Sequence, residues 1–129
     1  MFTIEQIKQE ENNVKSGADF PGFISSLAKL GIIRNDVYVI NGLSVYFGED
    51  GSVVESAPVY EELIIEEKSS AVALKDALKI HQAGETDYIT FCRQAAAAGV
   101  EKWVTDLTEK TVVYFDTEGH ELVKERLHQ

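Results

Sequence analysis

The sequence predicts a fold of the α+β class, an antiparallel sheet with helices packed on one face, and three observations support this prediction. The pattern VYFxxxG occurs twice, at residues 45–51 and 113–119. A segment with helical spacing of apolar residues, bounded by Asp and Gly, precedes each copy at 19–31 and 87–99. Runs rich in β-branched and aromatic residues, which are typical of strands, follow each of these segments.

The two copies align at an offset of 68 residues. Residues 19–51 fall on residues 87–119 without a gap, and eight of these 33 positions are identical. We therefore predict an internal duplication: one domain over residues 1–129, built of two pseudo-symmetric halves at about 1–66 and 67–129. A half of about 60 residues is marginal as an independent core, so we expect the halves to bury each other's apolar faces.

Two helices are predicted at the start of the first half. Thr3 and Gln6 fit a capping box that begins the first helix, which should end near Gly17. Asp19 is a suitable N-cap for the second helix because its carboxylate can accept a bond from a first-turn amide. Gly31 then ends this helix in a left-handed conformation.

Three strands are predicted to follow in the first half. Asn41-Gly42 joins two β-rich runs and favours a type I′ hairpin turn. A turn over residues 48–51 leads to a third strand in the run SVVES. The apolar segment APVYEELIIEE at 57–67 is predicted to be another extended strand between the halves.

The second half repeats this order. Ser69 or Ser70 can cap its leading helix, and Asp87 caps the next one, which ends at Gly99. A hairpin is predicted within KWVTDLTEKTVVYF, although its turn at Glu109-Lys110 lacks the Asn-Gly preference. The run HELVKERL is predicted to be the last strand.

Charge and composition exclude several classes of protein. Twelve Lys plus Arg against 22 Asp plus Glu give a formal net charge of −10, which repels nucleic-acid phosphates and anionic lipid surfaces. No apolar run approaches the roughly 18 residues that a membrane span needs. The N-terminal residues lack the pattern of a signal peptide, and the single Cys92 excludes an intramolecular disulfide. We therefore expect a cytoplasmic protein with no nucleic-acid or membrane partner.

One stretch carries a resemblance to a known family. The segment HQAGETDYITFCRQAAAAGVEKWVTDL resembles the small bacterial YbcV-like proteins, a family of unknown function often labelled "phage envelope protein". The similarity is most specific in TDYxxFC and AGVEKW, and it continues through TVVYFDTEG and back to MFTIEQI and SGADFP. The resemblance implies a compact single domain, a prophage association at most, and no catalytic residues that can be carried over.

Residues that break the internal repeat are the candidates for catalysis. Cys92 lies one turn into the helix capped by Asp87, where backbone amides can lower the pKa of its thiol. His81 and Asp106 would complete a nucleophilic site with it. The alternative, which we favour, is that Cys92 is a small buried hydrophobe, as its counterpart Ile24 would be.

Aromatic residues are the candidates for ligand binding. Trp103, the only tryptophan, together with Tyr88, Tyr46 and Tyr114, could wall a pocket between the halves, although a lone Trp on a strand more often packs in the core. The three histidines, including His128 near the end of the chain, have no metal-ligand spacing. We therefore predict no metal site, and no motif predicts a cofactor.

Three functions remain open after these exclusions. The favoured one is a binding or interaction module of bacterial or prophage origin, whose partner is an unknown small molecule or protein. The second is a small enzyme that uses Cys92 with His81. The third is a phage-associated structural protein that assembles with itself, with a homodimer as its simplest form.

Overall fold

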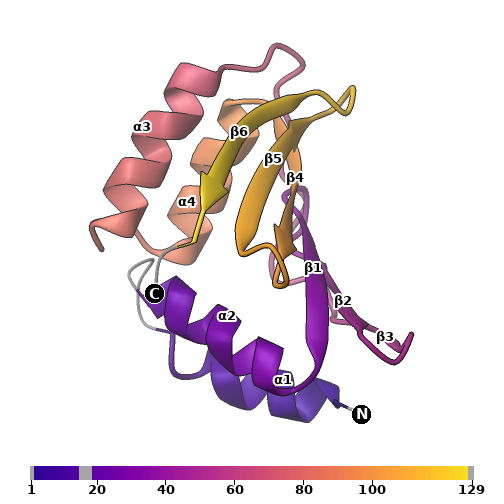
Figure 1. The fold of residues 1–129 in the computed structure, drawn as a ribbon. Coiled ribbons are helices and arrows are strands. Elements are labelled where there is room, and N and C mark those ends of the chain that lie inside the picture. Colours follow the sequence, from indigo (N-terminus) through magenta and orange to yellow (C-terminus); the bar gives the residue numbers. More distant parts are fainter. Residues whose placement is uncertain (1, 15–18, 128–129) are drawn as a thin grey trace.

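The computed structural model describes residues 2–14 and 19–127, and in these residues it confirms the α+β class. The described part of the chain forms four helices and one six-stranded antiparallel sheet. The helices lie on one side of the sheet and leave the other side uncovered (Figure 1). The first helix ends at Glu11, well before the predicted end near Gly17, so that bound is wrong. Gly17 itself and the tail residue His128 lie outside the described residues.

Each half contains two helices followed by three strands. The elements of the first half are α1 Ile4–Glu11, α2 Phe20–Lys29, β1 Ile32–Tyr38, β2 Ser44–Gly48 and β3 Val53–Glu55. Those of the second half are α3 Ala71–Gln82, α4 Tyr88–Ala97, β4 Val100–Asp106, β5 Thr111–Asp116 and β6 Glu121–Arg126. The bounds of α2 and α4, and those of β1 and β4, differ by the 68 residues found in the sequence.

The sheet has a pseudo-twofold arrangement about its centre. Its strand order is β3-β2-β1-β4-β5-β6, so β1 and β4 join the halves. In this central pair Asp36 lies opposite Val104, which is its own counterpart at the offset of 68. Matching register shifts occur in β1 after Ile32 and in β4 after Val100. The origin of this symmetry in a gene duplication stays a prediction.

The buried apolar side chains form two clusters. The first-half cluster is built mainly from α1, α2, β1 and β2, and the second-half cluster from α3, α4, β4, β5 and β6. The halves exchange one loop residue each: Val39 packs in the second-half cluster, and its counterpart Leu107 packs in the first-half cluster. Phe20 and Leu127 are partly buried against both clusters. The apolar interior therefore consists of two clusters, which are linked by these exchanged and shared residues.

Capping by a local side chain explains the start of three of the four described helices. Thr3 and Gln6 form the predicted capping box, and the side chain of Ser70 accepts a bond from the third residue of α3. Asp87 caps α4 by accepting a bond from the amide of Thr90 at 2.8 Å. Asp19 occupies the equivalent position before α2, but its side chain makes no capping bond, so that part of the prediction is wrong.

The predicted type I′ turn at Asn41-Gly42 is also wrong. A type I′ turn needs positive φ at both central residues, and of this pair only Gly42 has it, at 74°. The amide of Tyr38 donates to the carbonyl of Leu43, and the amide of Gly42 donates to the carbonyl of Tyr38, which closes a four-residue loop. In the second half Lys110 takes the place of Gly42, with a φ of 58°.

The segment at residues 56–70 is not the strand that was predicted for 57–67. Only the amide of Ser56 still donates to β2, at the carbonyl of Ser44. Beyond it, the amide of Leu63 donates to the carbonyl of Ile40 in the first hairpin loop, and that of Glu66 donates to Ala96 near the end of α4. Its apolar residues cover the second-half cluster instead of extending the sheet. These residues are Tyr60, Leu63 and Ile65.

Candidate functional site: the open face of the sheet

Cys92 is a buried core residue. Its side chain is fully buried in the second-half cluster. Burial raises the pKa of the Cys92 thiol, and interactions with the hydroxyls of Tyr60 and Tyr88 only partly oppose this. The pKa shift is therefore opposite to the lowering that a position near a helix N-terminus predicted. A protonated, buried thiol is a poor nucleophile.

His81 packs against the same cluster from α3. Its ring stacks on Phe91, with the centroids 4.6 Å apart, and its Nδ1 lies 3.1 Å from both the carbonyl and the hydroxyl oxygen of Thr86. Burial lowers the pKa of His81, although Thr86 and Asp87 partly oppose the shift. This side chain thus serves to pack the end of α3 against α4.

Trp103 is at the centre of an aromatic group in the core. It is 5% exposed, and its ring centroid lies 5.8 Å from that of Phe91 and 5.9 Å from that of Tyr114. The ring of Tyr88 meets it edge to face at 6.3 Å. Tyr46 lies in the other cluster, where its hydroxyl donates to Glu11 at 3.0 Å. Trp103, Tyr114 and Tyr46 therefore fill the interior of the two halves, whereas Tyr88 is 40% exposed and meets the core only at the edge of Trp103.

Asp106 points to the opposite side of the sheet from Trp103. Successive strand residues face opposite sides, and Trp103, Thr105 and Leu107 are the buried positions of this stretch. The carboxylate of Asp106 ends β4 by accepting bonds from the amides of Thr108 and Glu109, both at 2.9 Å. The structure therefore does not bring Asp106 together with Cys92 and His81.

Neither a metal site nor a membrane span is found in the described part of the chain. Within residues 2–14 and 19–127 no three His, Cys, Asp or Glu side chains gather closely enough to hold a metal ion. None of the described helices has the length and apolar character that crossing a bilayer requires.

The uncovered side of the sheet is the candidate binding site, and we call it the open face. Residues directly opposite each other in antiparallel strands point to the same side, so the strand register defines which side chains it carries. Its middle is an apolar stripe of half-buried side chains from four strands. These are Tyr38 in β1, Val45 and Phe47 in β2, Val104 in β4, and Val113 and Phe115 in β5.

Two cationic side chains at pseudo-equivalent positions make three contacts with the aromatic rings of this stripe. The guanidinium carbon of Arg34 lies 5.0 Å from the ring centroid of Phe47. Its counterpart Lys102 places its ammonium 5.7 Å from the ring of Phe115 and 6.0 Å from the ring of Tyr38. Contacts of this kind hold long cationic side chains flat against aromatic rings, so the stripe and its charges form one continuous surface.

Asp36 is the buried anchor of the open face. It is only 3% exposed, and both of its oxygens accept bonds from Arg34, at 2.8 Å from Nε and 2.7 Å from Nη2. The hydrogen bond to Asp36 raises the pKa of Arg34. A bidentate pair of this kind fixes the guanidinium in one orientation.

The open face is balanced in charge, unlike the chain as a whole. The register places four basic and four acidic side chains on it, although the chain has 12 Lys plus Arg against 22 Asp plus Glu. The excess acid therefore lies elsewhere on the molecule. The basic residues are Arg34, Lys102, Lys124 and Arg126, and the acidic residues are Asp36, Glu55, Asp106 and Glu121.

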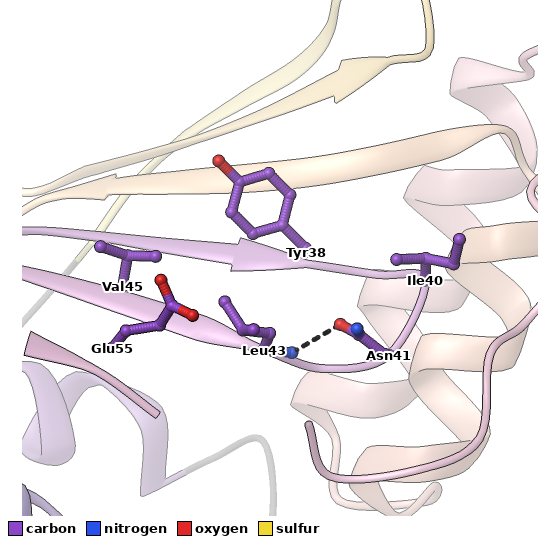
Figure 2. Close-up of a pocket in the computed structure, with 6 residues that line it drawn as sticks. All are labelled: Tyr38, Ile40, Asn41, Leu43, Val45 and Glu55. Atoms are coloured by element: carbon purple, nitrogen blue, oxygen red, sulfur yellow. Dashed lines mark hydrogen bonds between the residues drawn. The ribbon is translucent and has the colours of Figure 1, made fainter. Parts of the chain in front are cut away.

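A shallow hollow extends the open face toward the first hairpin loop. Its volume is about 350 Å³, and Figure 2 shows the six residues that line it. The amide of Leu43 donates to the side chain of Asn41 at 3.0 Å and fixes the loop beside the hollow. The lining residues are Tyr38, Ile40, Asn41, Leu43, Val45 and Glu55.

The open face was not predicted from the sequence, because the candidate residues were chosen as reactive types or as aromatic residues that could wall a pocket between the halves. The signal was present in the repeated VYF pattern, in which the central Tyr is buried and the flanking residues point outward. Outward apolar residues in both copies are Val45 and Phe47, and Val113 and Phe115. On a strand exposed to water these positions would ordinarily be polar.

Comparisons with known proteins give a family and relatives without a stated activity. The family described as "Protein of unknown function (DUF1398)" matches residues 8–126. Uncharacterised proteins of Mycobacterium bovis and Mycobacterium tuberculosis are 30% identical to this chain over 97 residues. The match covers 74% of this chain but only 59% of each relative, so the chain spans little more than half the length of these relatives.

Proposed function

Because the chain belongs to the family of proteins of unknown function DUF1398, which brings no activity with it, we propose from the structure alone that this protein is a binding module. Its binding surface is the open face of the sheet, and its partner is a protein. The predicted membership of a family of unknown function is confirmed. The narrower resemblance to the YbcV-like proteins, the prophage origin and the cytoplasmic location stay predictions, and the proposal needs none of them.

A single observation carries this proposal: the open face combines an apolar stripe with balanced charge in a strongly acidic chain. Binding surfaces are typically an apolar centre with aromatic residues and Arg, surrounded by a polar rim. Here Phe47, Phe115 and Tyr38 supply the aromatic centre, and Arg34 lies against it. A contiguous apolar patch on an otherwise charged molecule marks an interaction site.

The shape of the site favours a flat partner over an enclosed small molecule. Sites for small ligands are clefts that bury most of the ligand surface. The hollow beside Tyr38 and Glu55 is shallow and open, at about 350 Å³. The sheet around it offers a broad surface of regular rows, which suits another protein surface.

The enzyme alternative has less support. A nucleophilic cysteine needs access to its substrate and a thiol that ionises readily. Cys92 is fully buried with a raised pKa, and Asp106 points to the other side of the sheet. The ring of His81 is stacked on Phe91.

The proposal is tested by mapping where a small aromatic probe binds. Indole added to the ¹⁵N-labelled chain should shift the amide signals of β1, β2, β4 and β5 around the apolar stripe, because binding centres accept aromatic groups. The double variant Phe47→Ala/Phe115→Ala should lose this response. Val72→Ala, which removes an exposed apolar side chain from α3, is the matched control and should retain it. Shifts confined to the helices, or unaffected by the double variant, would show that the open face is not the binding surface.

A further inference from the structure

We propose that the open face binds a second copy of this chain, so that two sheets pack face to face about a twofold axis parallel to the strands. This inference rests on the proposed function because it uses the same surface. It goes beyond it by naming the partner and the geometry. Both follow from the strand register, which fixes the position of each open-face side chain.

The register places the open-face residues in three rows across the sheet. The middle row begins at Glu55 in β3 and ends at Lys124 in β6. Between them, in strand order, lie Val45, Asp36, Val104 and Val113. One flanking row contains Phe47, Arg34 and Asp106. The other contains Tyr38, Lys102 and Phe115.

A twofold axis parallel to the strands sets each strand of one copy against its mirror position in the other copy. Because the strand order is β3-β2-β1-β4-β5-β6, β1 then faces β4, β2 faces β5 and β3 faces β6 of the second copy. Aligned packing of this kind is one of the two ways in which sheets stack. Each facing pair occurs twice, once from each copy.

Opposite charges meet in this arrangement. In the middle row Glu55 faces Lys124 of the second copy. In a flanking row Arg34 faces Asp106 of the second copy. Two of the five guanidinium donors of Arg34 are engaged with Asp36, which leaves others to bind a second carboxylate. Complementary charges of this kind set the register of an interface.

Apolar and aromatic groups also meet suitable partners. Val45 faces Val113 of the second copy in the middle row, and Tyr38 faces Lys102 of the second copy in a flanking row. Asp36, already paired with Arg34, faces Val104 of the second copy. No two like charges of the middle row face each other.

The alternative axis, perpendicular to the strands, gives the opposite result in the middle row. It would set each middle-row residue against itself in the second copy. Asp36 would then face Asp36, Glu55 would face Glu55 and Lys124 would face Lys124. Like charges in direct opposition disfavour association, so the charges of the middle row favour the axis parallel to the strands.

The size of the face predicts a weak dimer. Strands about 4.8 Å apart and three rows about 7 Å apart give a face of about 600 Å² per copy for the six-stranded sheet. The total of about 1,200 Å² lies at the low end of specific interfaces. Each copy also carries a net charge of −10, which adds long-range repulsion. We therefore expect an equilibrium between monomer and dimer that depends on concentration.

Analytical ultracentrifugation of the full chain tests the inference. The wild-type protein should form dimers with a dissociation constant between about 1 µM and 1 mM, the range of weak complexes. Glu55→Lys and Lys124→Glu each turn both charge pairs into like-charge contacts, so each variant should dimerise at least about tenfold more weakly. An equimolar mixture of the two variants should restore dimers. In the mixed dimer the lysine introduced at position 55 faces the glutamate introduced at position 124, and the unchanged Lys124 and Glu55 of the two variants face each other.

A second variant pair controls for net charge alone. Lys75 is exposed on α3, and Glu85 is exposed in the loop after it. Glu85→Lys and Lys75→Glu change the net charge as Glu55→Lys and Lys124→Glu do, and mixing these two control variants should not increase dimerisation. A chain that remains monomeric to millimolar concentration would overturn the inference. The inference would also be overturned if mixing Glu55→Lys with Lys124→Glu increased dimerisation no more than mixing the two control variants does. If indole still maps to the open face in that case, the proposed function stands and the partner is a different protein. If indole does not, both proposals fail.

Discussion

At the scale of single residues, the chemistry-bearing side chains of the sequence serve the fold. His81 illustrates why: its ring lies flat on Phe91, and its Nδ1 lies beside Thr86, so α3 is held against α4. A residue type suggests reactivity, but the surroundings decide it. For Cys92 those surroundings are the apolar side chains of the second-half cluster and the phenol groups of Tyr60 and Tyr88 beside it.

The lowered pKa of His81 predicts a pH dependence of stability. The unfolded chain binds a proton at His81 near pH 6.5, whereas the folded chain binds it only at lower pH, because burial lowers the pKa. The contribution of His81 to the free energy of unfolding should therefore be fully present above about pH 6.5. It should decrease as the pH falls below that value, because the unfolded chain then binds the proton more readily than the folded chain. The variant His81→Phe keeps an aromatic ring on Phe91 but has no titrating group there. Its stability should therefore decrease less than that of the wild type as the pH falls.

Urea unfolding between pH 7.5 and pH 5.5 measures this effect. His120→Gln, at an exposed turn, is the control and should leave the contribution of His81 in place. An equal decrease in wild type and in His81→Phe would mean that His81 is not the group responsible.

At the scale of elements, local signals predicted the helices and strands but not the loops. Thr3, Ser70 and Asp87 were predictable because capping depends on residues within one turn. The hairpin loops depend on the other half: the amide of Val39 donates to Glu101, and that of Leu107 donates to Ile33. These bonds join each hairpin loop to the other half, and no local pattern contains them.

The segment at residues 56–70 and the open face could not be predicted, for related reasons. The apolar run at residues 63–65 has strand character, but Leu63 and Ile65 pack on the second-half cluster, which exists only after the sheet has formed. The open face depends on the register of β1 with β4, which places Arg34 beside Asp106 and Tyr38 beside Lys102. A sequence read along the chain does not contain that pairing.

The second hairpin offers a test of this loop geometry. Lys110 has a φ of 58°, which costs an L-residue about 1 kcal/mol relative to glycine. Lys110→Gly should therefore raise the free energy of unfolding by about 0.5 to 1 kcal/mol. The neighbouring variant Glu109→Gly, at a residue without positive φ, should lower it instead.

Chemical denaturation of both variants distinguishes them from wild type. Gly42, the counterpart of Lys110 in the first hairpin, provides the reverse substitution as a control. An added Cβ at Gly42 would lie 2.9 Å from the ring of Tyr60. Gly42→Ala should therefore be destabilising. A loss of stability in Lys110→Gly would contradict the assigned loop conformation.

At the scale of the whole molecule, the proposed binding surface depends on the two halves forming one unit. The open face spans β1 and β4, so its apolar stripe and its charge rows exist only when the halves share one sheet. The exchanged residues Val39 and Leu107 link the two clusters across this junction. We therefore expect the halves to fold together and to form a single binding surface.

Unfolding of Leu107→Ala by urea tests this claim most directly. Leu107 belongs to the second half but is buried in the first-half cluster, and its truncation should cost about 2 to 5 kcal/mol. Trp103 fluorescence reports on the second-half cluster, and amide exchange of α2 reports on the first half. We predict that both probes lose stability together and by the same amount. Loss of stability in α2 with an unchanged Trp103 transition would contradict the account.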